Sequence, residues 1–366
     1  MNILLVHLGS TGDCLFATAV ARQIKELDYP GCHLTWMIGS KYRHVLMNNH
    51  YVNDVIEVPI DSIEDLVRQR DAIPILLDEL RIKGRHFEEI FITDFTKQNY
   101  KYWYGTTRSA VFRSYPKKIK VAPEPVLCLT DDETLRVRSF AAENRLCDAA
   151  YVILFECSPR SGQSNIDINS ATEIAKTVVG LFPNAKVILS SSERIDCCNM
   201  GIIDGSILSY RENAELTKYC NLLVGCSSGI SWLNTSNWAA KTPMLQIVNS
   251  RYRENDISCS VKLDFEYFGL STDNLIELED APVREVLNCI ESILKVSFAH
   301  AKRKYDIEYS LTTDNLRYYF EARMPFWKKL TYIFRAAFRY GILKKYQQNK
   351  PAWFAPRVWV KRLWLK

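Results

Sequence analysis

The chain has 366 residues, which is too many for one ordinary hydrophobic core and favours two domains. Hydrophobic residues make up 47% and charged residues 24%, a balance that excludes a disordered chain. No run reaches the roughly 18 apolar residues of a membrane-spanning helix, and no secretory signal pattern is expected at the start. The eleven cysteines are scattered without a CxxC pair, which predicts reduced thiols in a cytoplasmic protein.

The formal net charge of +5 hides an uneven distribution. Twelve Lys or Arg and no Asp or Glu lie between Arg323 and Lys366, so the rest of the chain, with 35 basic and 42 acidic residues, has a formal charge of −7. The strongly basic C-terminal segment therefore indicates a binding partner different from that of the rest of the chain.

Strand-like and helix-like runs alternate from the start of the chain. Strands are predicted over 2–8, 33–38, 54–60 and 88–94, and helices over 13–27, around 40–49 and over 61–83. Such alternation predicts a parallel sheet with helices on both faces. The less regular segment 95–150 is predicted to end the first domain and to cross to the second.

The alternation then begins again. Strands are predicted over 151–156, 185–191, 222–225 and 242–248, and helices over 168–181, over 212–220, from 228 onward and over roughly 282–300. The fold class is therefore predicted as α/β, with two doubly wound, Rossmann-like domains facing a cleft. The predicted divisions are 1–148, 149–308 and a basic, aromatic tail at 309–366. Ligands of such sheets bind beyond the carboxyl ends of the strands, where three loops stand out.

The first loop is HLGSTGDCLFAT, residues 7–18. Gly9 and Gly12 allow a sharp turn and a close approach to a ligand, but the pattern is neither GxGxxG nor a P-loop. Asp13 suits the first turn of the following helix, where a carboxylate stabilises free amide groups and the helix dipole. It equally suits a general base that takes a proton from a sugar hydroxyl. Spacing alone leaves both interpretations open.

The second loop is FECSPRSGQSNID, residues 155–167. Its small and polar residues suit a phosphate, which hydroxyls and backbone amides bind well. Arg160 adds a fixed positive charge that can hold phosphate oxygens in pairs. A solvated polar turn is the alternative. The predicted donor-binding residues here are Arg160, Ser161, Gly162, Gln163 and Ser164.

The third loop lies in LLVGCSSGISWLNTS, residues 222–236. Ser227, Ser228 and Gly229 place hydroxyls and amides at the start of a predicted helix, which suits an anion or a sugar. A helix-capping pair of serines is the alternative. Upstream, Glu215 is a candidate to accept hydrogen bonds from ribose hydroxyls, or else an ordinary solvated glutamate.

Several familiar catalytic patterns are missing from the sequence. There is no GxSxG elbow and no HExxH pair, and DFE at 264–266 does not fit an acidic DxD metal motif. The six histidines are dispersed. The sequence therefore predicts no metal site and no resident cofactor.

Taken together, the first sixty residues resemble the ADP-heptose:lipopolysaccharide heptosyltransferases, glycosyltransferase family 9. The family's SxGD loop corresponds to residues 9–13, and its AxV run to 17–20. Its glycine-to-leucine segment corresponds to 39–46, and its NPxxDxV strand entry to 49–55. The resemblance implies that Asp13 is the general base. It also implies a GT-B fold and inverting transfer without a metal, because loop amides, hydroxyls and a cation neutralise the leaving diphosphate.

The second half departs from the family pattern. The family's phosphate loop falls on 157–164 without its usual lysine, for which Arg160 could substitute. The DTGxxH segment falls on 227–232, where Ser227 replaces Asp and Trp232 replaces His. We therefore expect a related transferase that uses another nucleotide sugar rather than one specific for heptose.

The tail begins MPFWKKLTYIFRAAFRYG and carries aromatic residues at helical spacing with basic residues around them. Such a helix suits an anionic membrane surface. Packing of a last helix on the N-terminal domain is the alternative, and nucleic acid is disfavoured because no binding fold accompanies the charge. The predicted membrane contacts are Trp327, Lys328, Lys329, Phe334, Arg335, Phe338 and Arg339.

The sequence thus predicts a cytoplasmic glycosyltransferase, peripheral on the inner face of the cell membrane. It would move a sugar from a nucleotide diphosphate to a hydroxyl of lipopolysaccharide or another surface glycan. The predicted acceptor-side residues are Gly9, Thr11, Gly12, Tyr102, Trp103, Arg108 and Arg113. Two alternatives are a non-catalytic nucleotide-sugar or glycan-binding protein of the same fold and a Rossmann oxidoreductase, which the missing GxGxxG disfavours.

Overall fold

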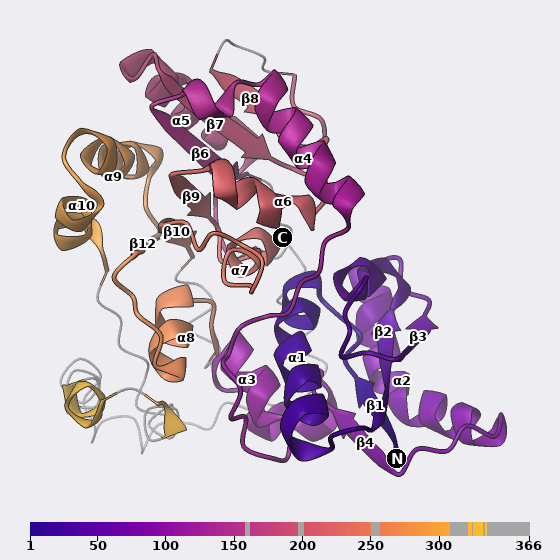
Figure 1. Ribbon diagram of the computed structural model, residues 1–366. Helices are drawn as coiled ribbons and strands as arrows, with labels where there is room; N and C mark the ends of the chain where they lie inside the picture. The colour runs from indigo at the N-terminus through magenta and orange to yellow at the C-terminus, as the bar shows by residue number, and fades with distance from the viewer. Residues whose placement is uncertain are drawn as a thin grey trace.

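The computed structural model describes residues 1–157, 162–196, 201–249 and 257–307, and further on 321–323, 325–331 and 334. Two larger parallel sheets are each flanked by helices (Figure 1). We call the part of the chain around the first sheet, residues 1–113, the first half, and the part around the second sheet, residues 131–305, the second half.

The first sheet has the strand order β3-β2-β1-β4. Its strands are β1 (Asn2–Val6), β2 (His33–Gly39), β3 (Asp54–Val58) and β4 (Glu89–Ile92), as predicted from their apolar runs. Two α-helices, α1 (Thr11–Gln23) and α2 (Ile63–Ile82), lie between these strands in sequence. A π-helical turn, Ile24–Asp28, extends α1, and the predicted helix near 40–49 is a 3-10 helix, Ser40–Leu46.

The central strand and helix of the first half are buried on all sides. Residues 3–6 of β1 are fully buried, which explains why the strand is an unbroken apolar run. Nearly every residue of α1 is buried as well, so this helix has no polar face. By contrast, α2 buries only Leu66 and Ile73 and begins with a capping box between Ser62 and Asp65.

The second sheet has the order β12-β10-β9-β6-β7-β8. Its strands are β6 (Tyr151–Glu156), β7 (Ala185–Ser190), β8 (Ile202–Asp204), β9 (Leu222–Gly225), β10 (Met244–Val248) and β12 (Leu275–Glu279). The chain runs outward through β7 and β8 and then returns to place β9 on the other side of β6. This change of direction is the switch point at which doubly wound sheets bind ligands.

Helices cover both faces of the second sheet. One face carries α5 (Ile168–Leu181), α9 (Val283–Lys295) and α10 (Phe298–Tyr305), which pack on one apolar cluster. The helices α4 (Asp131–Glu143), α6 (Glu212–Leu216) and α7 (Gly229–Leu233) contact one another and belong to the other face. The prediction of one helix over 282–300 is wrong, because Ser297 caps a new helix by accepting a bond from His300.

Short elements connect the two halves. The two-residue strands β5 (Gly105–Thr106) and β11 (Ile257–Ser258) pair in parallel, although 150 residues separate them in sequence. Next to them, α3 (Thr107–Arg113) of the first half packs on α8 (Val261–Phe268) of the second. Neither pair was predicted, because segments this short carry no periodic pattern.

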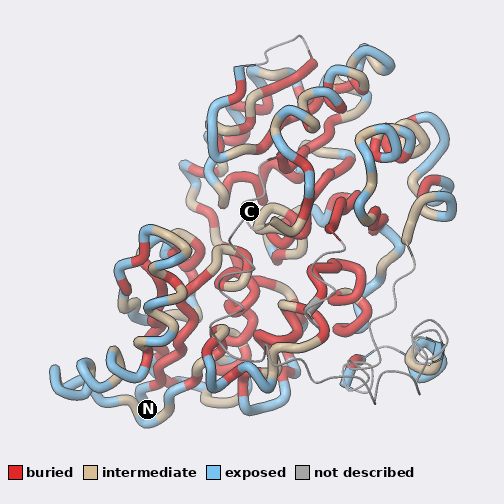
Figure 2. The backbone as a smooth tube through the Cα atoms, turned by 180° about the vertical axis from the view of Figure 1, so that it is seen from behind, coloured by how far each residue is buried: buried red, intermediate tan, exposed pale blue. Residues whose placement is uncertain are grey.

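Buried segments of the chain lie in both halves (Figure 2). One apolar cluster runs from the first sheet through α1 into the second half. At its centre, the Phe16 ring lies 4.7 Å from Phe112, 5.6 Å from Trp232 and 5.4 Å from Phe268, measured between centroids. Because these rings come from α1, α3, α7 and α8, the two halves meet through a packed core rather than across open solvent.

The described part of the C-terminal segment lies on both halves. Tyr104 donates a 2.6 Å hydrogen bond to Glu321, and the Arg323 amide donates to the Tyr267 carbonyl at 2.7 Å. Lys328 pairs with Glu266 on α8 at 2.9 Å. The described contacts thus involve Tyr104 of the first half and Glu266 and Tyr267 of the second, so packing of a last helix on the N-terminal domain stays a prediction.

Some of the side chains predicted to contact a membrane are exposed to solvent. Trp327 is 77% exposed and Phe334 is 69% exposed. Arg335, Phe338 and Arg339 lie outside the described residues, so membrane contact stays a prediction. Within the ranges given above, no helix combines the length and the apolar character needed to cross a bilayer.

Candidate functional site

Asp13 lies in the first turn of α1, directly beyond the carboxyl end of β1. Its Oδ2 accepts a 3.0 Å hydrogen bond from the Ser10 hydroxyl, and 13% of its side chain is exposed. Ser10, rather than Asp13, occupies the N-cap position. The carboxylate is therefore held in place at one oxygen and is not used to cap the helix.

The loop that carries Asp13 is fixed from two other elements. Asp94, buried after β4, accepts hydrogen bonds of 2.6 Å from the amides of Leu8 and Phe95. Arg70 of α2 pairs with Asp94 at 2.7 Å and also donates to the Gly9 carbonyl. This support could not be predicted from the sequence, because only the fold brings residues this far apart together.

Among the described residues, Arg108 is the basic side chain that lies within 4.0 Å of the Asp13 carboxylate. It is 3% exposed, and its Nε lies 3.7 Å from Asp13 Oδ1. Neither Arg108 Nε nor Asp13 Oδ1 has a hydrogen-bond partner among the described residues. The guanidinium carbon lies 4.6 Å from the ring centroid of Trp232 on α7, so Arg108 reaches from the first half to the second.

The surroundings of Asp13 favour its ionised form. Burial by itself raises the pKa of Asp13, but Arg108, His7 and Arg70 together with the Ser10 hydroxyl outweigh it. The pKa therefore lies below its ordinary value. Asp13 is a carboxylate at neutral pH, as a general base must be.

Two glycines bring the first turns of α1 and α7 together. A Cβ atom added to Gly12 would lie 3.5 Å from the Gly229 Cα atom and 3.1 Å from Arg108 Nη2. A Cβ atom added to Gly229 would lie 2.8 Å from the Tyr210 ring. The predicted acceptor-side loop, with Thr11 as the first residue of α1, thus meets the third predicted loop.

The third loop is held by side chains from inside the second half. The buried Ser227 hydroxyl donates to the Cys259 carbonyl, and its amide donates to Gln246 at 2.8 Å. The Ser228 hydroxyl donates to the carboxylate of Glu156, the last residue of β6. Burial raises the pKa of Glu156 despite these hydrogen bonds. Glu156 was not singled out from the sequence, where it reads as the end of a strand.

The second loop is described only in part. Arg160 and Ser161 lie outside the described residues. Gly162 has a φ of +67°, which favours glycine, and the Gln163 carbonyl accepts a 2.8 Å bond from the Asn249 amide. Ser164 is buried, and its hydroxyl accepts from the Ile166 amide at 3.3 Å.

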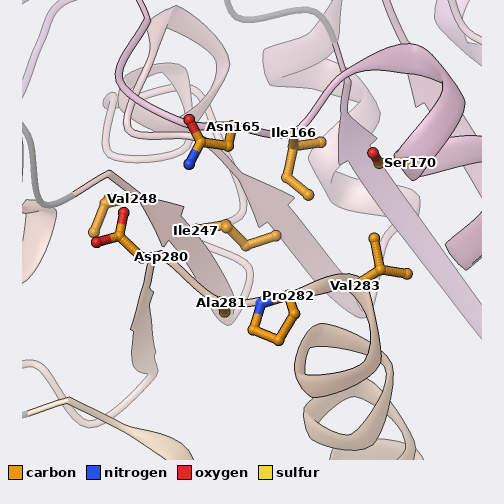
Figure 3. A pocket seen from close by; sticks show the side chains of 9 residues that line it. All are labelled: Asn165, Ile166, Ser170, Ile247, Val248, Asp280, Ala281, Pro282 and Val283. Atoms are coloured by element: carbon orange, nitrogen blue, oxygen red, sulfur yellow. The ribbon is translucent and has the colours of Figure 1, made fainter.

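A hollow of about 290 Å³ lies beside this loop, at the carboxyl ends of β10 and β12 (Figure 3). Its wall includes residues from the starts of α5 and α9, so it opens on the helix face opposite α7. Asn165, Ser170 and Asp280 contribute polar groups, and the remaining lining is apolar. The full lining comprises Asn165, Ile166, Ser170, Ile247, Val248, Asp280, Ala281, Pro282 and Val283.

The other predicted site residues make internal contacts. Glu215 accepts hydrogen bonds from Trp238 at 2.7 Å and from Lys218 at 2.6 Å, and it is buried. Arg113 donates to the Tyr102 carbonyl at 3.0 Å. The Trp103 ring packs 4.5 Å from Phe95. Ligand contact by these residues stays a prediction.

Metal ligands do not gather in the part of the chain that the structure describes: it has no cluster of three or more His, Cys, Asp or Glu residues arranged to hold an ion. No protein-family model and no curated protein sequence matches the chain.

Among solved structures, the chain is similar to a family 9 glycosyl transferase from Veillonella parvula, with a TM-score of 0.52 and 13% identity over 81% of this chain and 89% of the other. It is also similar to the Escherichia coli ADP-heptose lipopolysaccharide heptosyltransferase II, with a TM-score of 0.50 and 13% identity over 81% of this chain and 99% of that protein. The chain thus has the GT-B fold of the heptosyltransferase-like family 9 proteins, and the fold expected from the resemblance is confirmed.

Proposed function

We propose that the protein is an inverting glycosyltransferase in which Asp13 is the general base. The observation that carries the proposal is an ionised, partly exposed carboxylate at the carboxyl end of β1, facing the second half of a GT-B fold. Asp13 takes the proton of an acceptor hydroxyl as its oxygen attacks the anomeric carbon. The bond from that carbon to the diphosphate breaks on the opposite face of the sugar.

The donor is a nucleotide-diphosphate sugar, held at the switch point between β6 and β9. The polar loops that follow these two strands supply amides and hydroxyls, and Arg160 supplies a charge. One of the structural neighbours is named as an ADP-heptose enzyme. This chain carries Ser227 and Trp232 where that family has Asp and His, which supports a sugar other than heptose.

The acceptor is a hydroxyl of lipopolysaccharide or of another surface glycan, reached from the cytoplasmic face of the membrane. The twelve basic residues from Arg323 onward and the exposed Trp327 and Phe334 side chains support a peripheral attachment. Each basic residue near an anionic bilayer contributes on the order of 1 kcal/mol.

A thermal-shift panel tests the donor class. ADP-, GDP-, UDP-, CDP- and dTDP-sugars are added to the purified protein, with NAD and NADP as controls. A ligand at about 100 times its dissociation constant stabilises the fold by ~2.7 kcal/mol, a measurable shift. One nucleotide class is expected to shift the melting temperature. A shift with NAD or NADP alone would contradict the proposal.

Turnover then tests the role of Asp13. With the donor found in the panel, D13N is expected to lower sugar transfer by ~100-fold or more without weakening nucleotide binding. D78N is the matched control, because Asp78 is 71% exposed on α2. Equal activity in D13N and the unmodified protein would rule out Asp13 as the base, and binding without transfer in the unmodified protein would favour the non-catalytic alternative.

A further inference from the structure

The contact between Arg108 and Asp13 is incomplete as an ion pair. Charge-assisted N–H···O bonds are about 2.7–2.9 Å long, whereas Arg108 Nε and Asp13 Oδ1 are 3.7 Å apart. Both atoms are buried and lack a hydrogen-bond partner among the described residues. In the neighbouring pair, Arg70 Nε lies closer to its carboxylate, 2.7 Å from Asp94 Oδ1, although Arg70 Nε also lacks a hydrogen-bond partner among the described residues.

Trp232 explains how Arg108 is held without closing that pair. The guanidinium lies 4.6 Å above the Trp232 ring, an arrangement that stabilises a cation through the π-system. Stacking of this kind leaves the N–H donors at the edge of the guanidinium unused. Phe16 packs edge-on against Trp232 at 5.6 Å and keeps its ring in place. Arg108 is thus a fixed, buried cation with donor capacity left over.

We propose that Arg108 exchanges partners during the reaction, pairing with Asp13 in the free protein and with a phosphate of the nucleotide sugar in the complex. The inference rests on the proposed function and adds a positioning residue to it. Binding of the phosphate then draws the Arg108 charge away from the Asp13 carboxylate. Asp13 becomes a stronger base towards the acceptor hydroxyl when the donor is bound.

The charges around Asp13 make this exchange effective. Arg108 is the largest of the favourable influences that keep the pKa of Asp13 low, so moving its charge to a phosphate makes Asp13 a stronger base. Arg70 on α2 remains as a cationic neighbour, whereas burial lowers the pKa of His7, the residue directly after β1, and favours its neutral form. The neutral acids Tyr42, Tyr210 and Cys259 also face Asp13.

The chemical step balances with these groups. The acceptor proton goes to Asp13, and the acceptor oxygen forms a bond to the anomeric carbon with its lone pair. The electrons of the broken carbon–oxygen bond go to the leaving phosphate oxygen. Arg108 is then beside the oxygen that gains negative charge, where a preorganised cation is most effective.

Binding of inorganic pyrophosphate, measured by calorimetry, tests the exchange without any transfer reaction. In the unmodified protein Asp13 competes with pyrophosphate for Arg108, so D13N is expected to bind pyrophosphate on the order of tenfold more tightly. R108Q is expected to bind it on the order of tenfold more weakly. In the double variant the D13N substitution should have no further effect, because the residue competed for is gone.

The matched controls are D78N and R81Q, an exposed ion pair on α2 with the same two charges, which should leave pyrophosphate affinity unchanged. If R108Q does not fold, R108K keeps the charge and should retain binding within a few-fold. The exchange would be overturned if D13N bound pyrophosphate no more tightly than the unmodified protein. It would also be overturned if D13N changed pyrophosphate affinity equally in the presence and in the absence of Arg108.

Competition identifies the source of the phosphate. Displacement of pyrophosphate by a nucleoside diphosphate supports the proposal, whereas displacement only by glucose 6-phosphate would assign Arg108 to an acceptor phosphate and refute it. The outcome is separable from the proposed function. If D13N and R108Q are coupled in pyrophosphate binding but the protein transfers no sugar, the phosphate site stands and the proposed reaction is wrong. If D13N abolishes sugar transfer but the two substitutions are not coupled, the proposed reaction stands and the partner exchange is wrong.

Discussion

Replacement of Arg211 by methionine is expected to destabilise the protein strongly, because this buried side chain joins the two halves. Its Nε and Nη2 donate to the Glu133 carboxylate at 2.6 and 2.9 Å. Its Nη1 donates to the carbonyls of His44 and Met47 in the first half at 3.2 and 3.1 Å, and Nη2 also donates to the Cys128 carbonyl. Methionine fills similar space but leaves the carboxylate and three carbonyls without their donor.

Breaking a buried ion pair by removing one partner costs about 3–5 kcal/mol. A chain of 366 residues has an unfolding entropy near 0.8 kcal/mol/K, so R211M is expected to melt about 4–6 °C lower at pH 7. Burial raises the pKa of Glu133, but Arg211 and Thr130 outweigh it and the pKa lies below its ordinary 4.5. The stabilisation is therefore present above pH 4.5 and is lost as the pH falls through the lowered pKa.

Scanning calorimetry of the unmodified protein and of R211M at several pH values measures both effects. R81M is the control, since Arg81 is 76% exposed and its loss should cost less than about 0.5 kcal/mol. Equal melting temperatures for R211M and R81M would refute the reasoning, as would a difference that grows rather than shrinks as the solution is acidified.

Other substitutions test local features. Burial raises the pKa of Asp264 to about 7, so ionisation of this carboxyl opposes folding as the pH rises. D264N should therefore melt at a higher temperature than the unmodified protein at pH 8 but not at pH 3.5. A higher melting temperature for D264N only at pH 3.5 would contradict this reasoning. Gly9→Ala should lower the melting temperature because its Cβ atom would enter the Tyr42 ring. Gly180→Ala, which adds a Cβ atom in open space inside α5, should raise stability by about 0.5–1 kcal/mol, and a loss there would undermine the comparison.

The strands of both sheets could be predicted because parallel strands buried on two faces are continuous apolar runs. Residues 151–156 and 222–225 were predicted with the bounds that β6 and β9 have. The helix at 168–181 was equally well defined, since Asp167 caps it and accepts a bond from Ser170. Local signals of this kind do not depend on the rest of the fold.

The contacts that complete the site could not be predicted from the sequence. Arg108 and Trp232 meet although they are far apart in the chain, and Asp94 supports a loop more than 80 residues before it. Nothing local distinguishes Arg108 from Arg113, yet Arg113 donates to nearby carbonyls whereas Arg108 faces Asp13. Those roles are decided by which elements pack together, and a single sequence does not encode that in a local pattern.

The aromatic cluster around Phe16 has a consequence for how the chain folds. Phe16 and Phe112 belong to the first half, whereas Trp232 and Phe268 belong to the second, and all four are buried. A fragment that ended near residue 148 would expose Phe16 and Phe112 to water, because Trp232 and Phe268 would be missing. A fragment that began there would expose Trp232 and Phe268 in the same way. We therefore expect the two sheets to unfold together in a single transition, and we expect neither to be recovered as an independent soluble domain.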